Sequence, residues 1–240
     1  RRTDYGEADR LVTLLTPGRG KLRVIAKGVR KLTSRKAGHI ELFARTQLLL
    51  AKARTFDLIT QAELVDPHLA LREDVMRGGL AHYLCELADQ FAQEDHEDVA
   101  LFDLMVDGLM WLSTAKDPAL AIRYCEMRLL GLSGYRPQLF RCALTSAALE
   151  VDTESSETAG RGTPFSPADG GALSRPALSH AREWVTLTRS GLMLLRALQT
   201  QPFETIDALT VTRDLHAELE RAMQAYVSFV TERRMRSMGY

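Results

Sequence analysis

The spacing of the apolar residues changes once along the chain, and this change constrains the fold more than any other feature of the sequence. Up to about Val65, apolar residues fall in short segments, partly alternating with polar ones, which is typical of β-strands. After Pro67 they recur every three or four residues over longer segments, which is typical of amphipathic helices. We therefore predict an α+β protein with a first domain at residues 1–67 and an α-helical domain at residues 68–240.

The first domain contains several short strand candidates joined by turns. Residues 11–16 form a compact apolar run that ends at Pro17-Gly18, and residues 21–29 then alternate with period two. Residues 40–51 and 56–65 supply two more candidates. Strands of this number and length often close into a five-stranded barrel, because closure removes unpaired sheet edges. We therefore expect an N-terminal β-barrel of the OB-fold type.

The second domain contains helical periodicity interrupted by an irregular segment. Asp117 and Pro118 supply a cap and a first turn for one helix. Residues 137–180 lose the helical period, and the Ser-, Thr-, Glu- and Gly-rich stretch 152–164 predicts a loop. The helical periodicity is found at residues 80–91, 101–112, 120–130, 190–198 and 212–235.

The charge of the chain is unevenly distributed, although 31 basic and 31 acidic residues give a net charge of zero. Residues 1–54 contain 14 basic and four acidic side chains, a surplus of +10. We predict that these cations bind the phosphates of a nucleic-acid backbone without reading its sequence. Phe43 and Phe56 are candidates for base stacking or for the core. The predicted nucleic-acid-binding residues are Arg19, Lys21, Arg23, Lys27, Arg30, Lys31, Arg35 and Lys36.

Several motifs, in order along the chain, resemble those of the RecO family of recombination mediators. In the N-terminal part they are Tyr-Gly-Glu-Ala-Asp-Arg-Leu-Val-Thr-Leu-Leu-Thr at 5–16, Gly-Lys-Leu-Arg at 20–23 and Ala-Lys-Gly-Val-Arg at 26–30. In the C-terminal part they are Tyr-Arg-Pro-Gln-Leu at 135–139 and Phe-Ser-Pro-Ala-Asp-Gly-Gly at 165–171. Each motif is weak alone, but the ordered set is specific and extends over nearly the whole chain.

The resemblance implies a function in DNA repair and recombination. A protein of this family is expected to bind single- and double-stranded DNA, to anneal complementary strands and to help load RecA onto strands coated by single-strand-binding protein. The implied partners are RecR and the acidic, Phe-ended C-terminal tail of single-strand-binding protein. Such a tail needs an apolar pocket rimmed by cations. The candidates by region are Lys116, Arg123, Arg128 and Arg136.

The resemblance also directs attention to a metal site that this chain has lost. Many proteins of the family carry two CxxC pairs within the segment that corresponds to residues 137–180, and four thiolates would bind zinc. Here the four positions are Cys142, Thr145, Ser174 and Ala177, so three of them cannot supply a thiolate. We predict a zinc-finger-like segment at 137–180 that is held by packing and binds no metal.

The sequence contains no G-x-S-x-G, P-loop or H-E-x-x-H motif. The acidic cluster at 94–98 predicts a solvated loop more than a cation site. We therefore predict no catalytic activity and no cofactor. Two alternatives stay open: a generic OB-fold RNA- or DNA-binding protein without mediator activity, and a scaffold whose basic face binds an acidic protein tail.

Two further features bear on where the protein acts. Cys85, Cys125 and Cys142 are odd in number and far apart, which does not suggest a disulfide framework. No apolar run approaches the roughly 18 residues that a membrane helix needs. We therefore expect a cytoplasmic, nucleoid-associated protein without a membrane partner.

Overall fold

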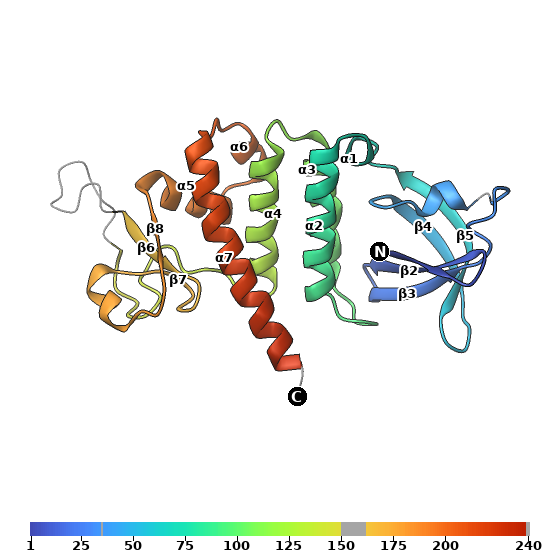
Figure 1. Ribbon diagram of the computed structural model, residues 1–240, viewed down its shortest axis with the longest axis horizontal. Helices are drawn as coiled ribbons and strands as arrows, with labels where there is room; N and C mark the ends of the chain where they lie inside the picture. Colours follow the sequence, from blue (N-terminus) through green and yellow to red (C-terminus); the bar gives the residue numbers. More distant parts are fainter. Residues whose placement is uncertain (35, 150–161, 239–240) are drawn as a thin grey trace. The chain divides into compact units, whose positions relative to one another are not determined.

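The computed structural model describes residues 1–34, 36–149 and 162–238, with side chains described up to Glu232. The chain divides into two compact units, Arg1–Pro118 and Ala119–Tyr240. The first contains a β-sheet and helices, and the second contains helices and a small sheet (Figure 1). The prediction of an α+β protein with an N-terminal sheet and a helical C-terminal part is confirmed.

The first unit is built on a five-stranded sheet with the strand order β1-β2-β3-β5-β4. Neighbouring strands are antiparallel except β3 and β5, which are parallel, with Val24 opposite Asp57. Because β3 and β5 are parallel, both strands begin at the same end of the sheet. The strands are β1 (Arg2–Tyr5), β2 (Asp9–Thr16), β3 (Gly20–Ala26), β4 (Arg45–Ala51) and β5 (Asp57–Asp66).

The sheet is open, and the prediction of a closed barrel is corrected on this point. Closure requires hydrogen bonds between the two end strands, and within the described residues β1 pairs with β2 while β4 pairs with β5. β1 has four residues, fewer than the five or six of a typical strand, and so offers few backbone groups for a second pairing.

The period-two pattern directs one set of side chains into a core within this unit. The predicted strand at 40–51 begins later than expected, because Ala37–Ile40 form the short 3-10 helix η1 and Phe43 adopts a φ of 65°. Ile40 nevertheless enters the core from η1. The buried cluster consists of Val12, Leu22, Val24, Ala26, Val29, Ile40 and Ile59.

Three helices complete the first unit, and α2 and α3 lie side by side in Figure 1. The Asp74 side chain caps α2, and the Asp98 side chain caps α3. Arg77 on α2 donates to the carbonyl groups of Leu112 and Ala115 at the C-terminal end of α3, where a cation is favourable. The helices are α1 (Ala70–Glu73), α2 (Val75–Phe91) and α3 (Val99–Thr114).

The second unit combines four helices with a three-stranded sheet of order β7-β6-β8 in its described residues. The sequence predicted α4, α5 and α7, whereas the five-residue helix α6 was too short to give a periodic pattern. The predicted loop at 152–164 lies largely outside the described residues. The elements are α4 (Pro118–Leu132), β6 (Thr163–Ser166), β7 (Gly171–Ala172), η2 (Arg175–His180), β8 (Val185–Leu187), α5 (Arg189–Thr200), α6 (Phe203–Asp207) and α7 (Arg213–Met238).

Of the helices in the described part of the chain, none combines the length and the apolar character needed to cross a lipid bilayer.

Candidate nucleic-acid interface

One end of the N-terminal sheet presents a loop that is held by backbone hydrogen bonds. The Asp9 carboxylate accepts a hydrogen bond of 2.7 Å from the backbone N–H of Gly28, and the N–H of Arg30 donates to the carbonyl of Ala8 at 3.0 Å. Gly28 adopts a φ of 66°, which favours glycine. The turn between β1 and β2 and the loop after β3 therefore lie against each other.

Exposed cations lie on this loop. Lys27 and Lys31 are exposed, and neither has an ion pair or hydrogen bond from its side chain among the described residues. Arg30 makes a long ion pair of 3.4 Å with Asp4, while Lys36 donates to the carbonyl of Ile59 at 3.0 Å. Lys27 and Lys31 are thus the predicted residues most available to an external phosphate. Arg35 lies outside the described residues.

Two side chains that the sequence analysis did not select also lie at this end. Tyr5 is 47% exposed and pairs across the turn with Asp9, which in turn binds Gly28. Leu32, next to Lys31, is fully exposed. An aromatic ring among cations suits an unpaired strand, because bases stack on the ring while cations bind phosphates. The one available signal for Tyr5 was its position directly before the turn glycine Gly6, whose φ is 61°.

The other end of β3 differs, because its cations already have partners. Arg19 donates to Asp57 at 2.9 Å and to Asp95 at 3.0 Å. The hydrogen bond from Arg19 is the main cause that lowers the pKa of the Asp57 carboxyl. Lys21 binds the Asp89 carboxylate at 3.0 Å, and Arg23 binds both carboxylate oxygens of Glu94 at 3.0 and 3.1 Å.

Two of these four partners, Glu94 and Asp95, belong to the acidic connection between α2 and α3, defined here as residues 92–98. Residues 93–97 of this connection are exposed, and its backbone pairs with β3 through Lys21 N–H to the Gln93 carbonyl at 3.0 Å and Asp95 N–H to the Lys21 carbonyl at 3.1 Å. A Cβ at Gly20 would lie 2.1 Å from the carbonyl oxygen of His96, so only glycine permits this approach.

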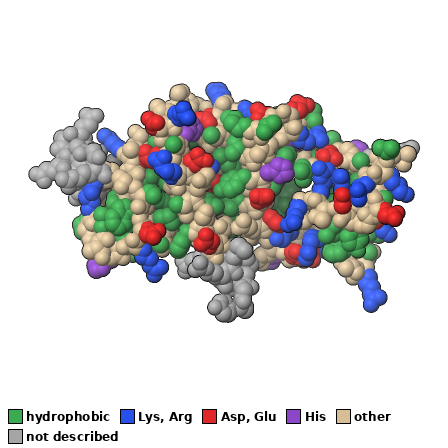
Figure 2. Space-filling view, in the orientation of Figure 1, with side chains coloured by type: hydrophobic (Ala, Val, Ile, Leu, Met, Phe, Trp, Pro, Cys, Tyr) green, Lys and Arg blue, Asp and Glu red, His purple; other side chains and the backbone are tan. Residues whose placement is uncertain are grey.

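These contacts show where the positive charge of residues 1–54 is compensated. The surplus of +10 in residues 1–54 is offset within the same compact unit, because residues 1–118 contain 17 basic and 18 acidic side chains. On the face drawn in Figure 2, Lys and Arg side chains over the N-terminal sheet have Asp and Glu side chains among them. The predicted nucleic-acid-binding cations therefore fall into two groups. One lies in the exposed loop at Lys27–Lys31, and the other, at Arg19–Arg23, is paired with carboxylates.

The two Phe residues considered for base stacking or for the core are both partly buried. The ring of Phe43 packs edge-on against His82 with 4.9 Å between the ring centres, and Phe56 is half-buried. Neither lies in the loop that contains the exposed lysines.

The four candidates for partner binding have different environments. Arg123 is buried and forms an ion pair of 2.9 Å with Glu126. Arg128 donates to the carbonyl oxygens of Gln199 and Gln201 and lies over the ring of Tyr124. Lys116 is exposed directly after α3.

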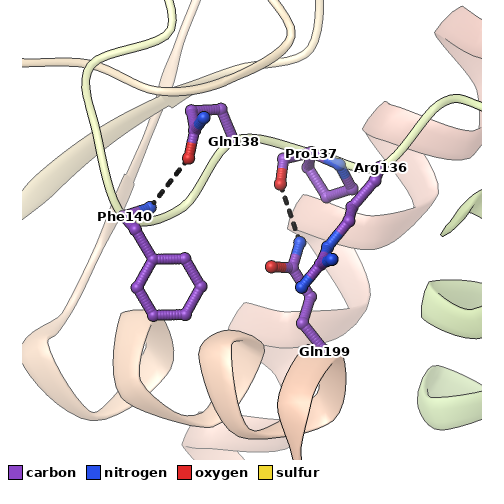
Figure 3. A pocket seen from close by; sticks show the side chains of 5 residues that line it. All are labelled: Arg136, Pro137, Gln138, Phe140 and Gln199. Carbon is purple, nitrogen blue, oxygen red and sulfur yellow. Dashed lines mark hydrogen bonds between the residues drawn. The ribbon is translucent and has the colours of Figure 1, made fainter. Parts of the chain in front are cut away.

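Arg136 is exposed and lines a shallow pocket of about 320 Å³ in the second unit (Figure 3). The amide nitrogen of Gln199 donates to the carbonyl of Pro137 at 2.7 Å, and Gln138 accepts from the backbone N–H of Phe140. Phe140 is 47% exposed beneath Arg196. A cation and an aromatic ring thus both line the pocket.

The positions of the predicted lost zinc site lie close together. Cys142 and Ala177 belong to one buried cluster with Leu173. Burial raises the pKa of the Cys142 thiol. Hydrogen bonds involving Ser174 and Thr145 together lower this pKa by more than burial raises it, to about 6. Among the residues that the structure describes, no three His, Cys, Asp or Glu side chains are grouped as metal ligands. The side chains present do not fit a zinc ion.

A Ser, a His and an Asp meet near the start of α1, but their geometry differs from that of a catalytic triad. Asp66 lies 3.6 Å and Ser113 lies 3.5 Å from the same ring nitrogen, Nδ1, of His68. A triad needs the carboxylate and the nucleophile on opposite ring nitrogens. Ser113 instead donates to the carbonyl of Leu109 in its own helix.

Comparison with known proteins agrees with this architecture. A family model described as Recombination protein O N terminal matches residues 1–68, and one described as Recombination protein O C terminal matches residues 72–239. A DNA repair protein RecO from Roseiflexus sp. (strain RS-1) is 40% identical over 240 residues, covering 100% of this chain and 81% of the relative. Proteins of the same name from Dehalococcoides mccartyi (strain BAV1) and Desulforudis audaxviator are 33% and 34% identical to this chain. Each match covers at least 98% of this chain and 90% of the relative.

A basic N-terminal sheet joined to a helical unit, with these matches over both, defines a protein of DNA repair and recombination. The chain belongs to the RecO family. The resemblance found in its motifs is thereby confirmed.

Proposed function

We propose that the protein is a recombination mediator that binds single- and double-stranded DNA, anneals complementary strands and helps load RecA onto strands coated by single-strand-binding protein. Family membership supports a function in DNA repair and recombination. Lys27 and Lys31, which are exposed and have no side-chain partner among the described residues, support the contact with DNA. Each phosphate that these lysines neutralise releases condensed counterions, which favours binding irrespective of base sequence. Annealing follows when two strands lose their mutual repulsion on one cationic surface, and this step needs no nucleotide hydrolysis.

The first experiment measures DNA binding by a double variant, Lys27→Glu with Lys31→Glu. We expect at least a tenfold loss of affinity for a single strand at about 100 mM salt, because two phosphate contacts become repulsive. The matched control is Arg72→Glu with Arg221→Glu, which changes the net charge equally at two exposed positions elsewhere. An equal loss in both variants would show that only net charge matters.

The second experiment tests mediator activity. Complementary oligonucleotides coated with single-strand-binding protein are mixed with the protein without ATP, and annealing is followed by fluorescence. Faster annealing that high salt suppresses supports the mediator. Strand binding without faster annealing would favour a generic nucleic-acid-binding protein, and an RNA strand would then be tested.

We further propose RecR and the tail of single-strand-binding protein as partners, with the tail at the Arg136 pocket. A carboxylate would pair with Arg136 and a phenyl ring would contact Phe140. Arg136→Glu should abolish binding of an acidic peptide that ends in Phe, whereas Arg213→Glu, at an exposed position of the same unit, should not. Gel filtration of the protein mixed with RecR tests the other partnership. Such a protein would act in the cytoplasm, in association with the nucleoid.

A further inference from the structure

The paired cations Arg19 and Arg23 lie near two further cations, in the turn between β4 and β5. Lys52 and Arg54 are exposed in the turn between β4 and β5, and neither side chain is paired among the described residues. β5 begins at Asp57, which lies opposite Val24, directly after Arg23 on β3, and its carboxylate accepts a hydrogen bond of 2.9 Å from Arg19. After the hydrogen bond from Arg19, the charge of Lys52 is among the causes that lower the pKa of Asp57, so Lys52 lies in the same neighbourhood.

The ion pairs of Arg19 and Arg23 are open to water. Side-chain exposure is 47% for each arginine, 65% for Asp95 and 50% for Glu94. Exposed ion pairs contribute little to stability, because water and salt screen the charges. A guanidinium group binds phosphate with the same fork of donors that binds carboxylate. Phosphates can therefore replace these carboxylates without a large energetic cost.

Lys21 differs from its two neighbours, since it anchors the acidic connection. Its side chain is 20% exposed and donates both to the Asp89 carboxylate and to the Asp89 carbonyl in the last turn of α2. The backbone bonds of Lys21 with Gln93 and Asp95 hold the connection on β3. The backbone of the connection can therefore stay in place while the carboxylates of Glu94 and Asp95 move.

We propose that Arg19, Arg23, Lys52 and Arg54 form a second phosphate-binding surface, which Glu94 and Asp95 mask until a nucleic-acid strand displaces their carboxylates. The two carboxylates occupy the places of backbone phosphates. A strand first binds the exposed Lys27–Lys31 loop and is then held close enough to compete for the arginines. This inference rests on the proposed binding of DNA and adds a built-in control of its strength.

The test removes the mask and leaves the cations. The double variant Glu94→Gln with Asp95→Asn keeps the backbone bonds and the side-chain volumes. The control, Asp103→Asn with Asp107→Asn, removes the same charge from two exposed positions on α3. Affinity for a fluorescent oligothymidine is measured by anisotropy from about 50 to 300 mM salt. We expect the unmasked variant to bind about three- to tenfold more tightly than the control.

A double-mutant cycle assigns the gain to the arginine. Glu94→Gln alone should tighten binding, and the gain should vanish when Arg23→Gln is also present. A gain that persists without Arg23 overturns the proposal, because it would then come from general charge. Thermal unfolding of each variant checks that the fold is kept, and the single variant Glu94→Gln leaves Asp95 and its backbone bond untouched.

The outcomes separate this inference from the proposed function. If the natural protein binds the oligonucleotide and the unmasked variant gains nothing over the control, the function stands and the mask is refuted. If neither binds, both fail. If an acidic peptide binds the unmasked variant more tightly than the oligonucleotide does, the surface serves a protein partner and the nucleic-acid assignment is wrong.

Discussion

Tyr5 is half exposed at the end of the sheet where Lys27 and Lys31 lie, two exposed lysines without a side-chain partner in the described part of the chain. Stacking of one base on an aromatic ring contributes about 1–3 kcal/mol and requires an unpaired base. We expect Tyr5→Ala to weaken binding of a single strand about tenfold and to leave duplex binding nearly unchanged. Tyr5→Phe should bind both as the natural protein does. Fluorescence anisotropy measures the affinity of Tyr5→Ala for a single strand and for a matched duplex. Equal losses of affinity for the two would exclude stacking.

His68 makes stability depend on pH. Burial, the largest cause, lowers its pKa below the ordinary value of about 6.5; Asp66 opposes this effect and Arg45 adds to it. The unfolded chain therefore binds a proton before the folded chain does as pH falls. The stabilising contribution is complete above about pH 6.5 and decreases as pH falls from there toward the lowered pKa of the folded state.

The variant His68→Asn tests this dependence, because asparagine tolerates the positive φ of 42° at this position. Urea unfolding at pH 7.5, 6.5 and 5.5 should show a smaller loss of stability in His68→Asn than in the natural protein. His180→Asn, at an exposed position, serves as the comparison and should keep the natural slope. An unchanged slope in His68→Asn would assign the pH dependence to other groups.

The environments of single residues were the part of the site least accessible from sequence. The pattern of cations selected Lys27, Lys31 and Arg23 alike, and all three are exposed, but Arg23 is paired with Glu94. A sequence pattern does not reveal such a distant partner. Arg123 resembled an ordinary helical arginine, yet it is buried with Glu126 three residues later. Pairing between segments far apart in the sequence depends on the tertiary structure.

At the scale of elements, the connection between α2 and α3 depends on one glycine. Gly20 has a φ of 54°, and a Cβ there would lie 2.1 Å from the His96 carbonyl oxygen and 2.9 Å from that of Gln93. We expect Gly20→Ala to lower the free energy of unfolding by about 2 kcal/mol or more. Gly18→Ala, two residues earlier, meets no atom within 4 Å and should change it by less than about 0.5 kcal/mol. Urea unfolding compares the two; equal values would refute the tight approach.

Positions 142, 145, 174 and 177, where the resemblance implied zinc ligands, lie close together. Cys142 contacts positions 145 and 174, and it shares a buried cluster with position 177. The triple variant Thr145→Cys, Ser174→Cys and Ala177→Cys should therefore bind one zinc ion through four thiolates. At free zinc about 100-fold above the dissociation constant, the ion should add about 3 kcal/mol of stability. Zinc content after gel filtration and the Tm with and without a chelator measure the effect.

The control for that prediction adds Cys142→Ser to the triple variant, which removes the fourth thiolate. Zinc bound equally by both proteins would show that the ion lies elsewhere, and no zinc in the triple variant would show that the four positions do not converge.

Long elements were predictable because their periods are local, and short or strained elements were not. The period of three to four residues located α2, α3 and α7, and the alternation located β3. The start of β4 was placed too early, because Ile40 is apolar and buried but reaches the core from a 3-10 helix. Closure of the sheet depends on pairing between its end strands, which no local pattern encodes.

At the scale of the whole molecule, the net charge of zero includes a strongly basic N-terminal segment whose charge is offset within the same compact unit. Residues 1–54 carry a surplus of +10, while the compact unit 1–118 that contains them is nearly neutral. Attraction to DNA therefore cannot come from the net charge of this unit. It depends on which cations are exposed and unpaired, and such local charges act within a Debye length of about 10 Å at 0.1 M salt.

The salt dependence of binding shows whether DNA contacts only the loop cations or the whole surplus of positive charge. For a single strand, log K falls with log salt concentration by about 0.7 for each phosphate neutralised. Ten contacts from the whole surplus would give a slope of about −7, whereas the loop with Lys27, Arg30, Lys31 and Lys36 provides about four contacts and a slope of about −3. We expect about −3 by anisotropy between 50 and 300 mM salt. A slope near −7 would contradict this, because it would mean that the cations of the whole surplus bind phosphates without having to displace a carboxylate. In the Glu94→Gln, Asp95→Asn variant the slope should steepen by about 1.4, since two more cations reach phosphates.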